Sequence, residues 1–322
     1  MDKFVNQTIN LVHNFLLRNS RFDEIMYYLN LEQDELIDYI NQINLKNNQT
    51  IPVMIINDRP KIVYHKREFK VHEFVTMKKR TKIMLVSDKH IDHTEDRIGY
   101  INDVYEEAEK KSIDYVFDLG DILNGPASKV HNPRKVRTGT LEGSIEQLKK
   151  HHPSNIPTYF ITGNHDLKFM ESNACDIGNL IEHECKNMVF LNNLFTSVNI
   201  GNFRINLSHG SLENKHLSNI KLYKEFRFLT KNRPHIICQG HFHVSDSIED
   251  VRPFLYQVPS LKAGNGSSRV GKVNGKGGEL GVIFLTIKEL SDEFEIEYEK
   301  LEFVETKKLI KREINLKKTI DY

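Results

Sequence analysis

The sequence predicts an α/β (α+β) protein whose main part is a two-sheet β-sandwich flanked by helices, preceded by a small separate domain. From residue 82 to residue 243, short apolar runs alternate with amphipathic helical patterns. After residue 244 the apolar runs follow one another without helices between them. A βαβ-rich half followed by a strand-rich half is typical of two sheets packed face to face with helices outside.

The first 65 residues predict three helices and a hairpin. Apolar residues recur at helical spacing in Gln7–Arg18, Arg21–Asn30 and Glu32–Ile43. Two β-prone runs, Ile51–Ile56 and Lys61–His65, then flank the turn-forming residues Asn-Asp-Arg-Pro. This order of elements resembles a winged helix-turn-helix domain.

Such a domain binds DNA through its third helix. Here that helix begins with Glu32, Asp34 and Glu35, and acidic residues outnumber basic ones by eight to six in residues 1–65. Acidic side chains repel phosphate, so a structural or protein-contacting role for this domain stays open. Residues 66–82 carry seven Lys and Arg against two Glu, and this stretch either contacts phosphate or is only solvated charge.

We therefore expect four parts along the chain. They are a winged-helix-like domain (1–65), a basic linker (66–81), the sandwich domain (82–303) and a basic C-terminal tail (304–322).

The main domain should contain strands and helices of ordinary length. Helices are expected at Arg97–Lys111, Thr140–His151, Ile177–Glu184 and His216–Leu229. Strands are expected at 83–87, 114–119, 159–161, 203–208 and 235–239, and at Phe195–Ile200, Phe254–Pro259, Leu280–Ile287 and Phe294–Phe303.

Five of these strands run directly into side chains that bind metals. The polar residues at the strand ends are Asp88 and His90, Asp121, Asn164 to Asp166, His209, and His241 and His243. Carboxylates, amide oxygens and imidazoles bind divalent ions, and sites in open α/β sheets lie at the carboxyl ends of strands. Residues two apart on an extended chain point the same way. The pattern therefore predicts a metal site at one edge of the sheets.

The ordered blocks DKH, GD, GNHD, H and GHFH, spread over about 82 to 300, resemble those of the calcineurin-like metallophosphoesterases. In motif they are closest to the repair-nuclease-like members. The resemblance implies two divalent ions, with manganese expected first and iron or zinc also suited to these ligands. One ion would be held by Asp88, His90, Asp121 and His243, and the other by Asp121, Asn164, His209 and His241.

The same resemblance implies a reaction. A metal-activated hydroxide would attack phosphorus in line, His165 would protonate the leaving group as general acid, and Asp166 would orient His165. Residues His131, Arg134 and Arg137, just beyond Asp121, are candidates for substrate phosphate contact, or else part of a solvated loop.

The substrate is less constrained, because the family hydrolyses many phosphoesters. Asp166 stands where the protein phosphatases of the superfamily carry Glu, which argues against a phosphoprotein. We expect hydrolysis of phosphodiester bonds in nucleic acid, with the N-terminal domain positioning the substrate. The alternative is an enzyme for a small nucleotide or phosphomonoester, with that domain as a lid or dimer interface. A DNA-binding regulator without turnover is disfavoured by the intact set of ligands.

Composition sets further bounds. The net charge of +1 implies no overall attraction to nucleic acid or to a membrane. Three cysteines without a CxxC pair and a polar N-terminus without a signal-peptide pattern lead us to expect a cytoplasmic protein. No apolar run is long enough to span a membrane. Gly266–Lys272 nearly matches a P-loop, but Val273 replaces the Ser or Thr that would bind magnesium, which argues against ATP binding.

Overall fold

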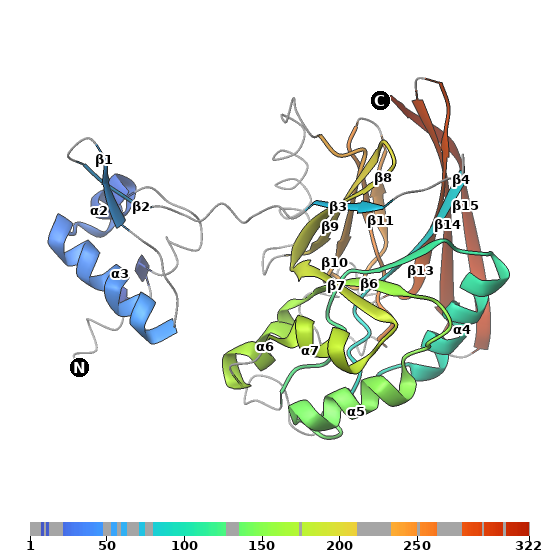
Figure 1. Ribbon diagram of the computed structural model, residues 1–322, viewed down its shortest axis with the longest axis horizontal. Coiled ribbons are helices and arrows are strands. Elements are labelled where there is room, and N and C mark those ends of the chain that lie inside the picture. The colour runs from blue at the N-terminus through green and yellow to red at the C-terminus, as the bar shows by residue number, and fades with distance from the viewer. Residues whose placement is uncertain are drawn as a thin grey trace. The chain divides into compact units, whose positions relative to one another are not determined.

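The computed structural model divides the chain into two compact units, Met1–Phe69 and Lys70–Tyr322 (Figure 1). The structure describes residues 8–9, 11–12, 22–47, 53–56, 59–62, 71–74, 80–126, 135–173, 176–210, 233–249, 252–262, 279–291, 293–304 and 307–321.

The N-terminal unit contains two described helices and a hairpin. These are α2 (Phe22–Leu29), α3 (Gln33–Asn47), and the antiparallel strands β1 (Val53–Ile56) and β2 (Arg59–Ile62). Its buried core consists of Ile9, Val12, Ile25, Leu36 and Ile40. The second helix, the third helix and the hairpin are thus present. The hairpin turn is tighter than expected, because Arg59 and Pro60 already pair with β1.

The larger unit contains two sheets (Figure 1). The seven-stranded sheet has the order β15-β14-β13-β4-β5-β6-β7, and the six-stranded sheet has the order β11-β12-β10-β9-β8-β3. The strands of the first sheet are β4 (Arg80–Val86), β5 (Tyr115–Asp118), β6 (Thr158–Thr162), β7 (Met188–Asn193), β13 (Leu280–Glu289), β14 (Glu293–Val304) and β15 (Lys307–Asp321). Those of the second are β3 (Val71–Phe74), β8 (Phe195–Ile200), β9 (Phe203–His209), β10 (Ile236–Gly240), β11 (Asp246–Ile248) and β12 (Phe254–Gln257).

Four helices cover the outer face of the seven-stranded sheet (Figure 1). They are α4 (Ile98–Lys110), α5 (Leu141–His151), α6 (Asn164–Asn173) and α7 (Ile177–Glu184). Along β4, Met84 and Val86 pack against these helices, whereas Ile83 and Leu85 face the six-stranded sheet. Because the second half of β4, residues 83–86, is buried on both faces, its sequence there is an unbroken apolar run rather than an alternating one. The expected two-sheet sandwich flanked by helices is confirmed.

Residues 66–81 were expected to be a linker, but in the structure part of this stretch, beginning at Val71, belongs to a sheet. Val71–Phe74 forms β3, which pairs in parallel with β8 at the edge of the six-stranded sheet. The ring of Phe74 packs edge-to-face on Tyr115 and Tyr159, with centroids 5.1 and 4.7 Å away. The strand is only four residues long and lies among basic residues, so local composition concealed it.

The expected basic tail of residues 304–322 is also different in the structure. Lys307–Asp321 forms β15, the edge strand that pairs antiparallel with β14. Ile320, near its end, is buried. Lysines are common on edge strands because they discourage further strand pairing, and this composition resembles that of a solvated tail.

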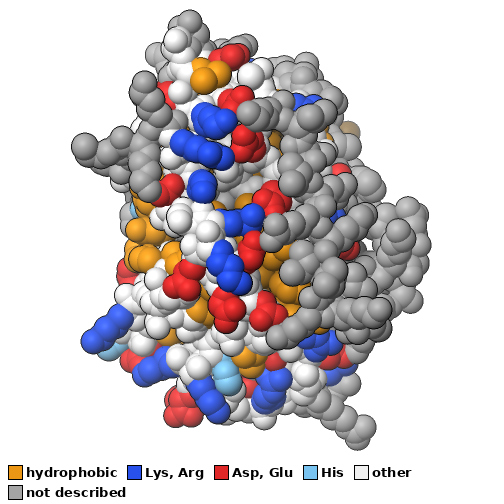
Figure 2. Space-filling model, turned by 90° about the vertical axis from the view of Figure 1, so that its right-hand side faces the viewer, with side chains coloured by type: hydrophobic (Ala, Val, Ile, Leu, Met, Phe, Trp, Pro, Cys, Tyr) orange, Lys and Arg blue, Asp and Glu red, His pale blue; other side chains and the backbone are white. Residues whose placement is uncertain are grey.

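Oppositely charged side chains alternate on the side of the molecule shown in Figure 2. The Nζ of Lys288 lies 2.6 Å from Glu295 and 3.2 Å from Glu297, and Lys111 lies 2.8 Å from Glu299. The cation of Lys288, on β13, is matched by anions on the neighbouring strand β14, and Lys111, at the end of α4, is matched by an anion on β14 as well.

Two features of the sequence lie outside the described residues, namely the expected helix His216–Leu229 and the P-loop-like segment Gly266–Lys272. The helix α6 and the strands β7 and β11 were not predicted. Where the structure describes the chain, it contains no helix with the length and apolar character needed to cross a membrane.

Candidate metal centre

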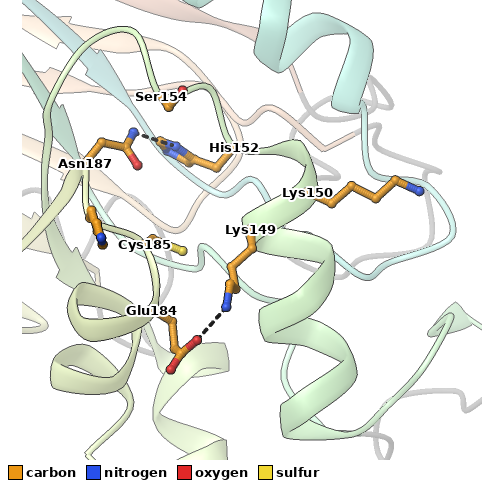
Figure 3. Close-up of a pocket in the computed structure, with 8 residues that line it drawn as sticks. Lys149, Lys150, His152, Ser154, Glu184, Cys185 and Asn187 are labelled. Carbon is orange, nitrogen blue, oxygen red and sulfur yellow. Dashed lines mark hydrogen bonds and ion pairs between the residues drawn. The ribbon is translucent and has the colours of Figure 1, made fainter.

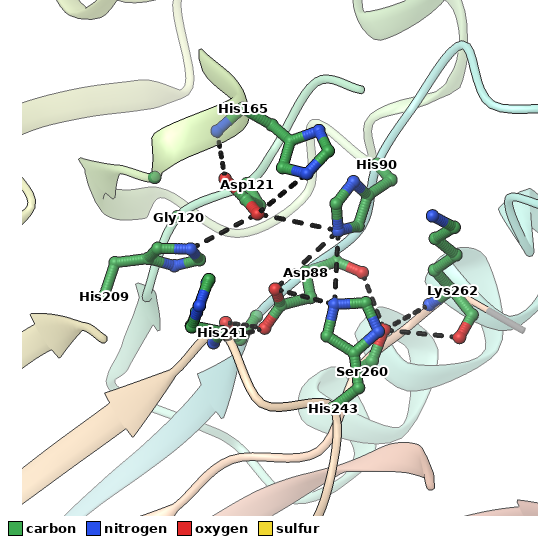
Figure 4. Close-up of polar contacts among 12 residues, drawn as sticks. Asp88, His90, Gly120, Asp121, His165, His209, His241, His243, Ser260 and Lys262 are labelled. Atoms are coloured by element: carbon green, nitrogen blue, oxygen red, sulfur yellow. Dashed lines mark hydrogen bonds and ion pairs between the residues drawn. The ribbon is translucent and has the colours of Figure 1, made fainter. Parts of the chain in front are cut away.

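The predicted ligands meet where the carboxyl ends of strands from both sheets come together (Figure 4). Strands β4, β5 and β6 are parallel neighbours in one sheet, and β9 and β10 are parallel neighbours in the other. Parallel neighbours end at the same edge, so side chains far apart in the sequence are delivered to one place.

One group of ligand atoms is formed by Asp88, His90 and His243. The Nε2 of His243 lies 3.1 Å from Oδ1 of Asp88 and 3.3 Å from Nε2 of His90. The Nε2 of His90 lies 3.7 Å from Oδ2 of Asp121. These atoms converge on a space between them, as the ligands of one ion do.

A second group is formed by Asp121, His209 and His241. The Nε2 of His209 lies 3.2 Å from Oδ2 of Asp121 and 3.1 Å from Oδ1 of Asn164. Asp121 also belongs to a group with His90 and His165. Its Oδ2 therefore lies between the two groups, with the Nε2 atoms of His209 and His90 on either side.

The donor atoms fit divalent ions. Oδ1 of Asp88 is buried and accepts no hydrogen bond within the described part of the chain, although imidazole nitrogens surround it. Such a carboxylate oxygen needs a cation nearby, and nitrogen and oxygen donors without sulfur suit manganese, iron or zinc. A divalent ion held by these residues would lower the pKa of a water molecule and neutralise charge on a phosphoryl group.

In His209 and Asp88, the protein holds the side-chain atom that does not face the other ligands. Nδ1 of His209 donates to the carbonyl oxygen of Leu119 over 2.6 Å. Oδ2 of Asp88 accepts from the hydroxyl of Ser87 and from the backbone N–H of His241, at 2.6 and 2.9 Å. Such contacts orient ligands toward an ion before it binds.

The backbone of the site is strained. Five of the expected ligands have positive φ angles, which are 54° for Asp88, 45° for His90, 52° for Asp121, 82° for His241 and 54° for His243. Asp and His tolerate this region better than bulky residues do, but it still costs free energy that the surrounding structure must offset. Strain concentrated on ligands is typical of a functional site.

Two glycines allow the segments of the site to approach closely. A Cβ on Gly163 would collide with the carboxylate and the backbone N of Asp121, and a Cβ on Gly240 would collide with Oγ of Ser87. Both glycines belong to the motifs noticed in the sequence. Their role became visible only when the opposing segments were seen in place.

Electrostatics favour anionic carboxylates in the site. Burial alone would raise the pKa of Asp121, but His209 and His165 hold it well below its usual range. Burial alone would lower the pKa of His209, but Asp121 and Asp88 raise it to about 10. The site therefore attracts positive charge, as a cation-binding centre must.

His165 lies beside the ligand groups, and the group that holds its imidazole is not Asp166. Nδ1 of His165 donates to the carbonyl oxygen of Asn124 over 2.7 Å, and its Nε2 lies 4.0 Å from Oδ2 of Asp121. Asp166 is fully buried and accepts instead from the backbone N–H groups of Gly163, Ile122 and Leu123. Asp166 thus joins two loops of the site. A backbone carbonyl such as that of Asn124 leaves no signal in a sequence.

The expected substrate contacts are only partly visible. His131 and Arg134 lie outside the described residues. Arg137 forms a two-pronged ion pair with Asp96, with Nη2 of Arg137 2.8 Å from Oδ1 of Asp96. The guanidinium charge is therefore already matched by a carboxylate.

A buried polar cluster behind the site was missed in the sequence. Lys89 stands between two expected ligands, and its Nζ lies 2.8 Å from Oδ2 of Asp118, with both side chains fully buried. The same Nζ lies 3.0 Å from Nε2 of His152 and 3.3 Å from the hydroxyl of Tyr105. This cluster supports the turn that carries Asp88 and His90.

A surface pocket of about 540 Å³ reaches His152 from the other side (Figure 3). It is lined by Lys149, Lys150, His152, Ser154, Glu184, Cys185, Lys186 and Asn187. None of the expected metal ligands is among them, and the cation of Lys149 is paired with Glu184 at 2.7 Å. The pocket is separate from the metal centre.

Two packed sheets with convergent His, Asp and Asn side chains at their strand ends define a metal-dependent hydrolase. The family "Calcineurin-like phosphoesterase superfamily domain" matches residues 81–259, which is more than half of the chain. The protein therefore belongs to the calcineurin-like phosphoesterase superfamily. No curated protein sequence matches the chain significantly.

Solved structures of similar fold are distant in sequence. Vps29 of Chaetomium thermophilum is 14% identical, covering 75% of this chain and 97% of that one, with a TM-score of 0.43. Vps29 of Entamoeba histolytica complexed with zinc is 14% identical, covering 73% and 99%, with a TM-score of 0.40. An uncharacterised predicted phosphoesterase of Streptococcus pneumoniae is 15% identical, covering 74% and 100%, with a TM-score of 0.37. Likeness at this level does not identify a substrate or a partner.

Proposed function

We propose that the protein is a two-metal phosphodiesterase that cleaves nucleic acid, with manganese as its metal. The observation that supports this most is the pair of ligand groups that share Asp121, with Nε2 of His165 4.0 Å from the shared oxygen. This distance places the Nε2 of His165 at the rim of the ligand groups, where it would face the leaving oxygen of a phosphoester bound there.

The residues divide the chemistry among them. Asp88, His90 and His243 would hold one ion, and Asn164, His209 and His241 the other, with Asp121 between them. His165 keeps its Nδ1 proton on the carbonyl of Asn124, so its Nε2 is the atom that can pass a proton to the leaving oxygen. Burial lowers the pKa of His165, and the carboxylate of Asp121 opposes this by favouring the protonated imidazole.

The choice of nucleic acid is supported by the N-terminal unit. Tyr27 and Tyr28 are adjacent on α2 and are 81% and 64% exposed. Exposed aromatic rings stack on unpaired bases, and each such contact is worth about 1–3 kcal/mol. A winged helix-turn-helix role for this unit, with phosphate contacts from the basic stretch that follows it, is part of the proposal.

One observation favours the second candidate, an enzyme for a small nucleotide or phosphomonoester. The first turn of α3 carries Asp34 and Glu35, and both are exposed. An acidic helix start repels a phosphate backbone, which would suit a unit that binds another protein or a second copy of the chain instead.

The test compares wild type with His165→Ala and with His183→Ala, whose side chain is 83% exposed on α7. Each manganese-loaded protein is assayed on bis-p-nitrophenyl phosphate, p-nitrophenyl phosphate, single- and double-stranded DNA, and RNA. We expect cleavage of a polymer by wild type and by His183→Ala, and its loss in His165→Ala. Cleavage of the small diester with every polymer left intact would refute the nuclease proposal.

A second comparison tests the N-terminal unit. Replacing both Tyr27 and Tyr28 by Ser should raise KM for single-stranded polymer at least ten-fold and leave KM for the small diester unchanged. Equal KM values for the polymer before and after the change would remove the support that these rings give.

A further inference from the structure

Lys262 is a cation beside the metal centre that the proposed mechanism leaves unused. It follows Ser260, whose hydroxyl donates to the carbonyl oxygen of Asp88 over 3.0 Å and accepts from the backbone N–H of Lys262 over 2.8 Å. These contacts fix the start of the Lys262 side chain next to an expected ligand. In Figure 4 that side chain extends on the side of the site where His90 lies.

The charge of Lys262 acts on the groups of the site. Burial is the main cause that lowers the pKa of His90, and the charge of Lys262 lowers it further. The same charge also lowers the pKa of His165. Among the residues that the structure describes, its Nζ makes no hydrogen bond and no ion pair. Burial lowers the pKa of Lys262, which Glu95 opposes. A partly buried cation without a partner costs free energy, and binding an anion would offset that cost.

His93 provides a second donor at the same place. Its Nδ1 accepts from the backbone N–H of Glu95 over 2.9 Å, so the neutral ring carries its proton on Nε2. Burial, as the larger cause, and the charge of Lys262 together lower the pKa of His93 to about 3, which keeps the ring neutral. Nε2 has no hydrogen-bond partner within the described segments, although the residue is only 5% exposed.

The backbone brings the two donors together. Lys262 forms an antiparallel bridge with Asp96, at the end of the turn that carries His93. The backbone N–H of Asp96 donates to the carbonyl oxygen of His93 over 3.1 Å and closes that turn. Two chain segments, 91–96 and 260–262, therefore meet beside His90 and present one ammonium and one imidazole N–H.

We propose that Lys262 and His93 form a phosphate-binding subsite beside the metal centre that takes a non-bridging phosphoryl oxygen of the substrate. The inference rests on the proposed phosphoester hydrolysis and names two further substrate-binding residues for it. An ammonium makes a charge-assisted hydrogen bond to such an oxygen, and the imidazole N–H makes a neutral one.

The experiment measures orthophosphate binding to manganese-loaded protein by calorimetry at constant ionic strength. The variants are Lys262→Met, Lys262→Arg and His93→Phe, with Lys150→Met as the control that removes an equal charge from the exposed last turn of α5. Manganese binding without phosphate and the melting temperature are measured for each. KM and kcat for bis-p-nitrophenyl phosphate are measured in parallel.

We expect Lys262→Met to weaken orthophosphate binding at least ten-fold, because a charged hydrogen bond is lost. Lys262→Arg should stay within about three-fold of wild type, and His93→Phe should lose about three- to ten-fold. Lys150→Met should behave as wild type. Manganese affinity should be the same in all variants, and KM should rise more than kcat falls in Lys262→Met.

Two results would overturn the subsite. One is orthophosphate binding by Lys262→Met equal to that of wild type. The other is a parallel loss of manganese affinity, which would make Lys262 a structural support of the ligands. Failure of the proposed function looks different, because wild type would then hydrolyse no ester while phosphate binding still depended on Lys262. Hydrolysis with unchanged KM and phosphate affinity in Lys262→Met would leave the function intact and refute the subsite.

Discussion

Replacing Lys89 by Met should destabilise the larger unit strongly, although Lys89 is not expected to touch metal or substrate. Its Nζ lies 2.8 Å from Oδ2 of Asp118, and both side chains are fully buried. Methionine has a similar length and no charge, so Asp118 would be left as an unpaired carboxylate in an apolar surrounding. Breaking a buried ion pair from one side costs about 3–5 kcal/mol.

The pH dependence follows from Asp118. Burial raises the pKa of Asp118 even in wild type, and Lys89 opposes this. Without Lys89 the carboxyl would bind its proton more tightly in the folded state than in the unfolded state, so stability would fall as pH rises through that interval. The destabilisation should therefore be largest at pH 8 and smaller at pH 5.

The assay is urea unfolding at pH 5 and pH 8. The urea concentration at the midpoint is compared between the variants and wild type, provided that the dependence of the unfolding free energy on urea concentration is the same in all of them. The double variant Lys89→Met with Asp118→Asn removes both charges and keeps Oδ1, which accepts from the N–H of Gly120 over 3.1 Å. It should regain more than half of the lost stability. A Lys89→Met protein within about 1 kcal/mol of wild type at both pH values, or a double variant as unstable as the single one, would refute the reasoning.

Three further outcomes are expected. His165→Ala should lower kcat about 10²–10⁴-fold on diesters with alkyl leaving groups. The loss should be smaller on p-nitrophenyl esters, because p-nitrophenolate leaves without a proton. Equal losses on the two kinds of ester would contradict the role of His165 as a general acid. Gly163→Ala would push a methyl group against the carboxylate of Asp121 and should weaken manganese binding about 10–100-fold. The control is Gly99→Ala, whose methyl group would meet no atom within 4 Å and should leave manganese binding unchanged. Calorimetry measures the manganese affinity of both variants. Removing metal with a chelator should lower the melting temperature, because ions at 100 times their Kd add about 2.7 kcal/mol to the free energy of unfolding. A melting temperature that is the same with and without metal would contradict a centre built from these ligands.

The expected ligands were recognisable because each lies within a few residues of the carboxyl end of a buried apolar run. His90, Asp121 and His209 stand at such junctions, and strands that run in parallel end at a common edge. The shared edge brings together residues that lie up to 155 positions apart in the sequence, from Asp88 to His243.

The role of Asp166 was predicted wrongly because adjacency in sequence was taken for contact. Its carboxylate turns away from the imidazole of His165 to accept backbone N–H groups from residues 122, 123 and 163. The group that holds His165 is a backbone carbonyl 41 residues away, at Asn124. Any residue type could supply that carbonyl, so no residue pattern could reveal it.

The amino-acid sequence by itself determined the alternation of strands and helices, the two-sheet class and the identity of the expected ligands. The spacing of apolar residues and the polar residues at strand ends are local properties. They can be recognised in a short stretch of sequence, whichever distant segments pack against it. Tertiary structure alone decided that Val71–Phe74 and Lys307–Asp321 join the sheets as edge strands, that Lys89 pairs with Asp118, and that Lys262 stands beside His90. Each of these depends on which distant segment supplies hydrogen bonds or charge, and a charged residue has the same local pattern whether it faces water, a buried carboxylate or a phosphate.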